Sequence, residues 1–178
     1  MRKALRRLFK IQKNQSPDAD GYLHILEKAI NLELKQKIYA LEGLGEVVAE
    51  KLQRKYTDVF ESQGKRNLSI KICRDIDGDG ISDLTAERCL EKEYRSQITI
   101  NYETVAANED KDIDAFTIDL WYYYGGFIGS GCGTLFDLNN DLEKEIEEVL
   151  IFYSMTNNPR NKKKATKGFP ITGYVFSE

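Results

Sequence analysis

The chain has 178 residues, of which 41% are hydrophobic and 11% aromatic, enough for a packed core and incompatible with a wholly disordered chain. The net charge of −3 is unevenly spread, because residues 1–13 and 160–167 are basic and the region between them is acidic. Nucleic acid is therefore an unlikely partner except through the basic termini. Three cysteines without a Cys-x-x-Cys pair disfavour a disulfide scaffold or zinc site, and no apolar run is long enough for a transmembrane segment. These features predict a cytoplasmic or virion-associated protein.

Residues 1–20 are predicted to form a basic N-terminal segment and linker. MRKALRRLFKIQK has the pattern of a short basic amphipathic helix, and NQSPDADG has the composition of a linker.

Residues 21–62 are predicted to form a helical arm. Apolar side chains recur every three or four positions from Tyr22 to Phe60, which is the pattern of a helix with one buried face. The EGLGE stretch at 42–46 leaves two possibilities open, a bend in one long helix or the turn of a helical hairpin.

Residues 63–178 are predicted to form a calcium-braced α+β domain. Alternating apolar positions predict strands at 68–74, 96–105 and 115–124. The glycine-rich stretch at 125–137 is predicted to be irregular, and residues 84–94 fit either a strand or a short helix.

The last part of the chain predicts a helix over 137–155, capped by Asn140 or Asp141, and a final strand in FPITGYVF at 169–176. The predicted fold is therefore α+β: a long N-terminal helix or helical hairpin packed on a small, mostly antiparallel β-sheet, with a C-terminal helix.

The stretch CRDIDGDGISDL at 73–84 concentrates oxygen ligands. Calcium takes six to eight oxygens, and a loop supplies them from alternate positions with glycine at the sharp turn. Four crowded carboxylates would otherwise repel one another and raise their pKa values. We therefore predict a Ca²⁺ site whose ligands are Asp75, Asp77, Asp79, the carbonyl of Ile81 and Asp83, with Glu87 as a possible extra ligand.

The D-x-D-G-D-G-x-x-D pattern resembles the calcium loops of EF-hands, dockerins, thrombospondin type-3 repeats and integrin-type propeller repeats. The resemblance covers residues 75–83 alone. It departs from the EF-hand at Ala86, where the bidentate glutamate would stand, and a predicted strand precedes the loop where an EF-hand has a helix. The resemblance implies an ion that braces the structure.

Two further features are candidates for binding or chemistry. Trp121 and Tyr123 alternate with Tyr122 and Tyr124, so they form an exposed aromatic interface if only one strand face is core; a strand buried on both faces is the alternative. Cys132 lies among glycines, but a thiol enzyme is disfavoured because the single histidine, His24, is far away in the sequence.

No phosphate loop, zinc set or catalytic triad is recognisable, so the leading hypothesis is a non-enzymatic calcium-binding protein. It would act as an interaction or assembly component, for example of a phage particle or other large complex, with a protein partner and possible homo-oligomerisation. The alternatives are an acidic inhibitor or immunity-type protein that binds a basic partner, and a calcium-dependent carbohydrate-binding module that uses Trp121.

Overall fold

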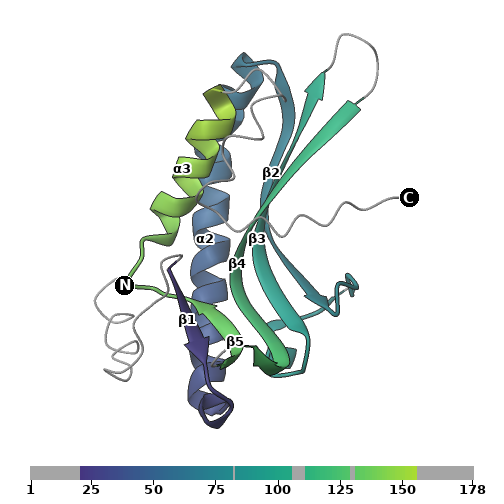
Figure 1. Cartoon of the computed structure of the whole chain (residues 1–178). Helices are drawn as coiled ribbons and strands as arrows, with labels where there is room; N and C mark the ends of the chain where they lie inside the picture. Colours follow the sequence, from purple (N-terminus) through teal and green to yellow (C-terminus); the bar gives the residue numbers. More distant parts are fainter. Residues whose placement is uncertain (1–20, 82, 106–110, 129–130, 156–178) are drawn as a thin grey trace.

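The computed structural model describes residues 21–81, 83–105, 111–128 and 131–155, so the basic N-terminal segment and the predicted strand at 169–176 lie outside the described residues. A five-stranded antiparallel sheet in the order β1-β5-β4-β3-β2 carries two long helices on one face (Figure 1). The predicted α+β fold is confirmed. The strands and long helices, in chain order, are β1 (Tyr22–Ile25), α2 (Leu32–Ser62), β2 (Lys65–Ile76), β3 (Tyr94–Val105), β4 (Lys111–Ile128), β5 (Gly131–Phe136) and α3 (Leu142–Met155).

α2 is one continuous helix of 31 residues, so the helical hairpin is not formed. Asn31 begins it by accepting a hydrogen bond from the Leu34 amide at 3.1 Å. Gly45 lies at a close contact between the helix and the sheet. A Cβ atom there would lie 3.2 Å from each of three core methyl groups, those of Ile72, Ile98 and Leu120.

α2 and the sheet share one hydrophobic core, so the helix is a layer of the domain and does not project as an arm. The first residues predicted as helical are instead strand β1, which pairs with β5, and a 3₁₀ turn at Glu27–Ala29 separates them from α2. The apolar residues of this short strand and the following turn also face the core, so their spacing resembles that of a helix.

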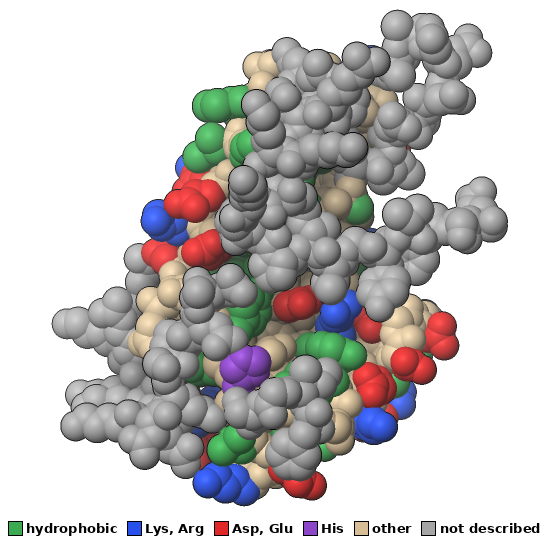
Figure 2. Space-filling model, in the orientation of Figure 1, with side chains coloured by type: hydrophobic (Ala, Val, Ile, Leu, Met, Phe, Trp, Pro, Cys, Tyr) green, Lys and Arg blue, Asp and Glu red, His purple; other side chains and the backbone are tan. Residues whose placement is uncertain are grey.

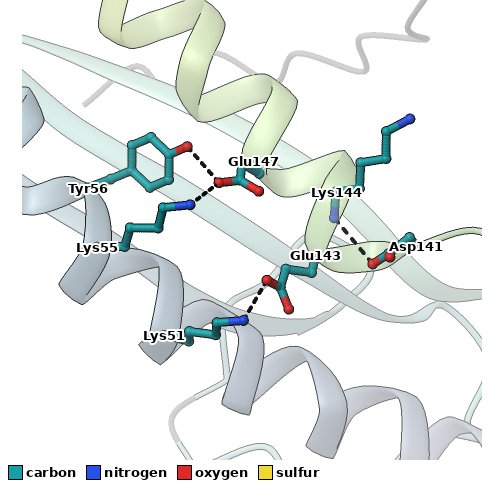
Figure 3. Close-up of polar contacts among 7 residues, drawn as sticks. All are labelled: Lys51, Lys55, Tyr56, Asp141, Glu143, Lys144 and Glu147. Atoms are coloured by element: carbon teal, nitrogen blue, oxygen red, sulfur yellow. Dashed lines mark hydrogen bonds and ion pairs between the residues drawn. The ribbon is translucent and has the colours of Figure 1, made fainter. Parts of the chain in front are cut away.

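α3 lies beside α2 and is joined to it by a row of polar contacts (Figure 3). Lys51 Nζ lies 2.6 Å from Glu143 Oε1, Lys55 pairs with Glu147, and the Tyr56 hydroxyl donates to Glu147 at 2.8 Å. Burial and the neighbouring Glu147 raise the pKa of Tyr56 to about 12, so the phenol stays a donor. Because successive turns of α2 meet successive turns of α3, the two helices run in the same direction.

The glycine-rich stretch predicted to be irregular contains the end of β4 and all of β5. Gly133 explains why glycine is needed there: a Cβ atom would lie 2.5 Å from the Trp121 ring and 2.9 Å from the Tyr122 carbonyl oxygen. Its glycines therefore allow a strand to pass under a large aromatic side chain.

Candidate functional site

The predicted calcium loop begins as a tight hairpin turn. Ile76 and Asp79 exchange two backbone hydrogen bonds, of 3.3 and 3.0 Å, around Asp77 and Gly78. Both central residues have positive φ, 57° and 81°, as a type I′ turn requires, and Asp-Gly is a favoured pair for that turn. Since Ile76 also pairs with Tyr94 of β3, the returning chain lies on the outer side of β2.

The predicted ligands do not form a metal-binding set in this conformation. Asp75 is half-buried at the end of β2, and its Oδ1 accepts from the Gly78 amide at 3.1 Å. Asp77, Asp79 and Asp83 are exposed. Among the described residues, no three or more His, Cys, Asp or Glu side chains are grouped to hold a metal. Of the remaining predicted ligands, Ile81 is 40% exposed, and Glu87 is exposed with its carbonyl bound by Lys35 Nζ at 2.7 Å. Calcium binding at this loop stays a prediction.

Asp75 instead belongs to a charged cluster on the sheet face opposite the helices. Arg95 lies across from it in the ladder, 3.5 Å from Asp119 Oδ1 and 4.7 Å from the centroid of the Tyr122 ring. Burial raises the pKa of Asp119, Arg95 opposes that rise, and the charge of Asp75 adds to it. Burial also raises the pKa of Asp75, against the Gly78 hydrogen bond and Arg95. One arginine thus serves two carboxylates.

A second polar group lies inside the core and joins α2 to the sheet. The Glu42 carboxylate is 2% exposed and accepts from the Tyr94 hydroxyl at 2.9 Å and from Arg74 Nε at 2.7 Å. Burial first, and then the charge of Glu42, raise the pKa of Tyr94, which keeps its proton as a donor. Because the three side chains bond to one another, with Arg74 also paired to Glu46, and are largely enclosed, this network is structural.

Two of the three cysteines, Cys89 and Cys132, are buried and have the environment of inert thiols. Cys132 is 2% exposed in β5 and donates to the Ile25 carbonyl at 3.3 Å, and burial raises its pKa. His24 does come near in space, opposite Thr134 and two residues along β5 from Cys132. Burial and the charge of Glu42 raise the pKa of Cys89 to about 12. Neither thiol is set up as a thiolate nucleophile.

Trp121 is fully buried, so the predicted exposed aromatic face is wrong for this residue. The register between β3 and β4 shifts between Ser96 and Gln97, where Trp121 and Asp119 are the successive partners. This bulge places Leu120 and Trp121 in the core together, and the Trp121 indole donates to the Cys89 carbonyl at 2.7 Å. Tyr123 is half-buried and stacks on Trp121, with ring centroids 6.1 Å apart.

The outer edge of β2 is the surface that the sequence did not indicate. β2 ends the sheet order, so β3 is its one partner among the described strands. The Ile70 amide points away from β3, because it donates to Gln53 Oε1 of α2 at 2.8 Å. In an antiparallel pair this direction repeats at every second residue, so Ile72 and Arg74 also present their backbone groups outward. Gln53 caps one end of this stretch and the Asp77–Gly78 hairpin closes the other.

A groove of about 890 Å³ runs between this edge and α2. Val47 is the most exposed apolar side chain in it, at 65%. Its rim carries both charges, since Glu50 and Arg54 form an exposed ion pair of 2.9 Å. The lining residues are Glu46, Val47, Ala49, Glu50, Gln53, Arg54, Ile70, Lys71 and Ile72.

Exposed apolar side chains also gather at the C-terminal end of α3, beyond the ion pairs of its first turns (Figure 2). Ile151 and Phe152 are each 39% exposed and Met155 is 76% exposed. No described residue shows what covers them, and we place no site there.

The structure is that of an α+β protein with a groove beside one edge of its sheet. No family model, curated protein or solved structure matches the chain. No helix among the described residues is long and apolar enough to cross a membrane.

Proposed function

We propose that the protein is a non-enzymatic interaction or assembly component that binds an extended segment of a protein partner along the outer edge of β2. The observation that carries this proposal is the outward backbone of Ile72 and Arg74 beside an open groove. An unpaired strand edge accepts another strand through main-chain hydrogen bonds, and pockets for alternate side chains give such binding its selectivity.

The groove would receive every second side chain of the bound segment. Residues that point toward α2 would contact Val47 and the apolar part of Ile72, and residues of the other set would lie beside Lys71 and Cys73. Gln53 can yield the Ile70 amide to the ligand, because its amide is a neutral and replaceable partner. The accepting stretch is then Ile70 to Arg74, which favours a short segment with an apolar residue at its centre.

The charges around the groove are balanced, with Glu46 and Glu50 on one side and Arg54 and Lys71 on the other. A partner with one acidic and one basic residue beside its apolar centre would complement this rim. A purely basic partner, as the inhibitor hypothesis requires, has no such specific support here. The carbohydrate hypothesis loses its platform because Trp121 is enclosed.

Peptides selected from a random library against the full chain provide the test, with affinity measured by fluorescence anisotropy. We expect Val47→Glu to weaken binding at least about tenfold, because it places a charge in the apolar part of the groove. Val59→Glu is the matched control, since Val59 is also exposed on α2 at 41% but does not line the groove. Equal affinity for both variants, or a selection that gives no binder, would refute the proposed site.

Calcium binding by the loop at 75–83 remains a second proposal, supported by its sequence pattern. It concerns the hairpin that ends the β2 edge, so an ion there would act on the same region of the molecule.

A further inference from the structure

We infer that residues 169–176 of this chain, FPITGYVF, occupy the outer edge of β2 as an added strand and compete with a partner for it. This inference rests on the partner site proposed above. Occupancy by residues 169–176 would regulate the access of the partner to that site. Four features of the described residues and the sequence support it.

The first is the position of the end of α3. Lys65, the first residue of β2, donates through Nζ to the Tyr153 carbonyl and also lies 3.4 Å from the Ser154 carbonyl. The chain therefore leaves α3 next to the start of the strand whose edge is open.

The second is reach. From Lys65 to Ile72 is seven residues of strand, or about 23 Å. Rounding the end of α2 adds about one helix diameter, roughly 10–12 Å. Residues 156–168 are thirteen residues and span up to about 43 Å when extended. The connection is long enough without strain.

The third is charge. The connection carries Arg160, Lys162, Lys163, Lys164 and Lys167. The part of α2 that it must pass carries exposed acids, Asp58 and Glu61 near the C-terminal end and Glu50 beside the groove. Asp58 and Glu61 therefore attract the basic connection to the C-terminal end of α2.

The fourth is the pattern of the segment itself. Phe169, Ile171 and Val175 fall on one side of an extended chain, with Gly173 between the last two. That side supplies the apolar groups the groove would bury against Val47. Pro170 lacks an amide hydrogen, which an edge strand tolerates where the amide would face solvent.

Amide hydrogen exchange on the full-length protein, read by NMR, tests this occupancy. Ile72 and Arg74 point outward, whereas Lys71 and Cys73 bond to β3 and serve as internal controls in the same strand. We expect all four amides to be protected in the wild type. In the variant Ile171→Asp, exchange should accelerate at least about tenfold at Ile72 and Arg74 and stay unchanged at Lys71 and Cys73. Asn161→Ser, an uncharged position of the connection outside the segment, is the control variant and should leave all four slow.

Equal exchange rates at Ile72 and Arg74 in the wild type and in Ile171→Asp would overturn the occupancy. Protection that depends on protein concentration would also overturn it, because a second copy would then supply the strand. Library peptides that bind the wild type and Ile171→Asp equally well, with loss of binding in Val47→Glu, would leave the proposed function standing without self-occupancy. Under the inference, those peptides bind Ile171→Asp more tightly than the wild type.

Discussion

Replacing Glu42 with alanine should lower the free energy of unfolding by about 3–5 kcal/mol, the range for breaking a buried charged pair. Glu42 is 2% exposed and is the acceptor for both Tyr94 and Arg74. Without it the fully buried Tyr94 hydroxyl loses its partner, at about 1–3 kcal/mol. Arg74 keeps a second carboxylate, Glu46 at 3.1 Å, so its share of the loss is the smaller one.

A double-mutant cycle separates these contributions. Tyr94→Phe removes the hydroxyl itself, so the pair Glu42→Ala/Tyr94→Phe should be less destabilised than the sum of the single variants by about 1–2 kcal/mol. Urea unfolding at pH 7, followed by circular dichroism, measures all four proteins. Glu50→Ala is the control, because that acid forms an exposed pair and should change stability by less than about 0.5 kcal/mol. A Glu42→Ala variant as stable as Glu50→Ala, or an additive cycle, would show that the network does not hold α2 to the sheet.

Three further outcomes are expected. Gly133→Ala should destabilise the protein by about 1–3 kcal/mol in urea, because its Cβ atom would lie 2.5 Å from the Trp121 ring; an unchanged midpoint would mean that the ring moves freely. Hydrogen bonds from Lys55 and Tyr56 lower the pKa of Glu147, so its stabilising effect is present above the unfolded value of about 4.3 and is lost as the pH falls through the folded value. The urea midpoint of Glu147→Gln should therefore approach that of the wild type below about pH 4, and a constant difference from pH 7 to 3 would contradict the assignment. If the loop binds calcium, an ion concentration of about 100 times the Kd adds about 2.7 kcal/mol and raises Tm, an effect that Asp79→Asn should reduce; identical melting in calcium and in chelator would refute that prediction.

The sequence predicted the elements whose apolar spacing is regular over a long stretch. α2 and α3 each keep one buried face for several turns, and Asp141, one of two predicted caps, accepts from the Lys144 amide at 3.4 Å (Figure 3). β3 was predicted almost to its ends, because Ile98, Ile100 and Tyr102 alternate with polar residues. Periodicity succeeds where one element has one core face throughout.

The missed features depend on contacts between distant residues. The glycine content of β5 is typical of a loop, and the sequence does not show the contact between Gly133 and Trp121 that requires glycine in a strand. The bulge opposite Ser96 reverses which side of β4 is core, and no local pattern marks it. Asp77-Gly78 was a recognisable hairpin signal, but the surrounding aspartates favoured a metal loop over it. The open edge of β2 exists only because no described strand follows it in the sheet, which is a property of topology.

The pairing of β1 with β5 has a consequence for how the protein is made. Tyr22 lies opposite Phe136, so the first described strand has no partner until most of the chain has been synthesised. The three-strand meander β2-β3-β4 uses local connections and can assemble early with α2, whereas closing the β1 edge joins residues more than a hundred positions apart. We expect folding to finish at β1, with its late docking setting the slowest step and leaving β5 exposed on the nascent chain until then.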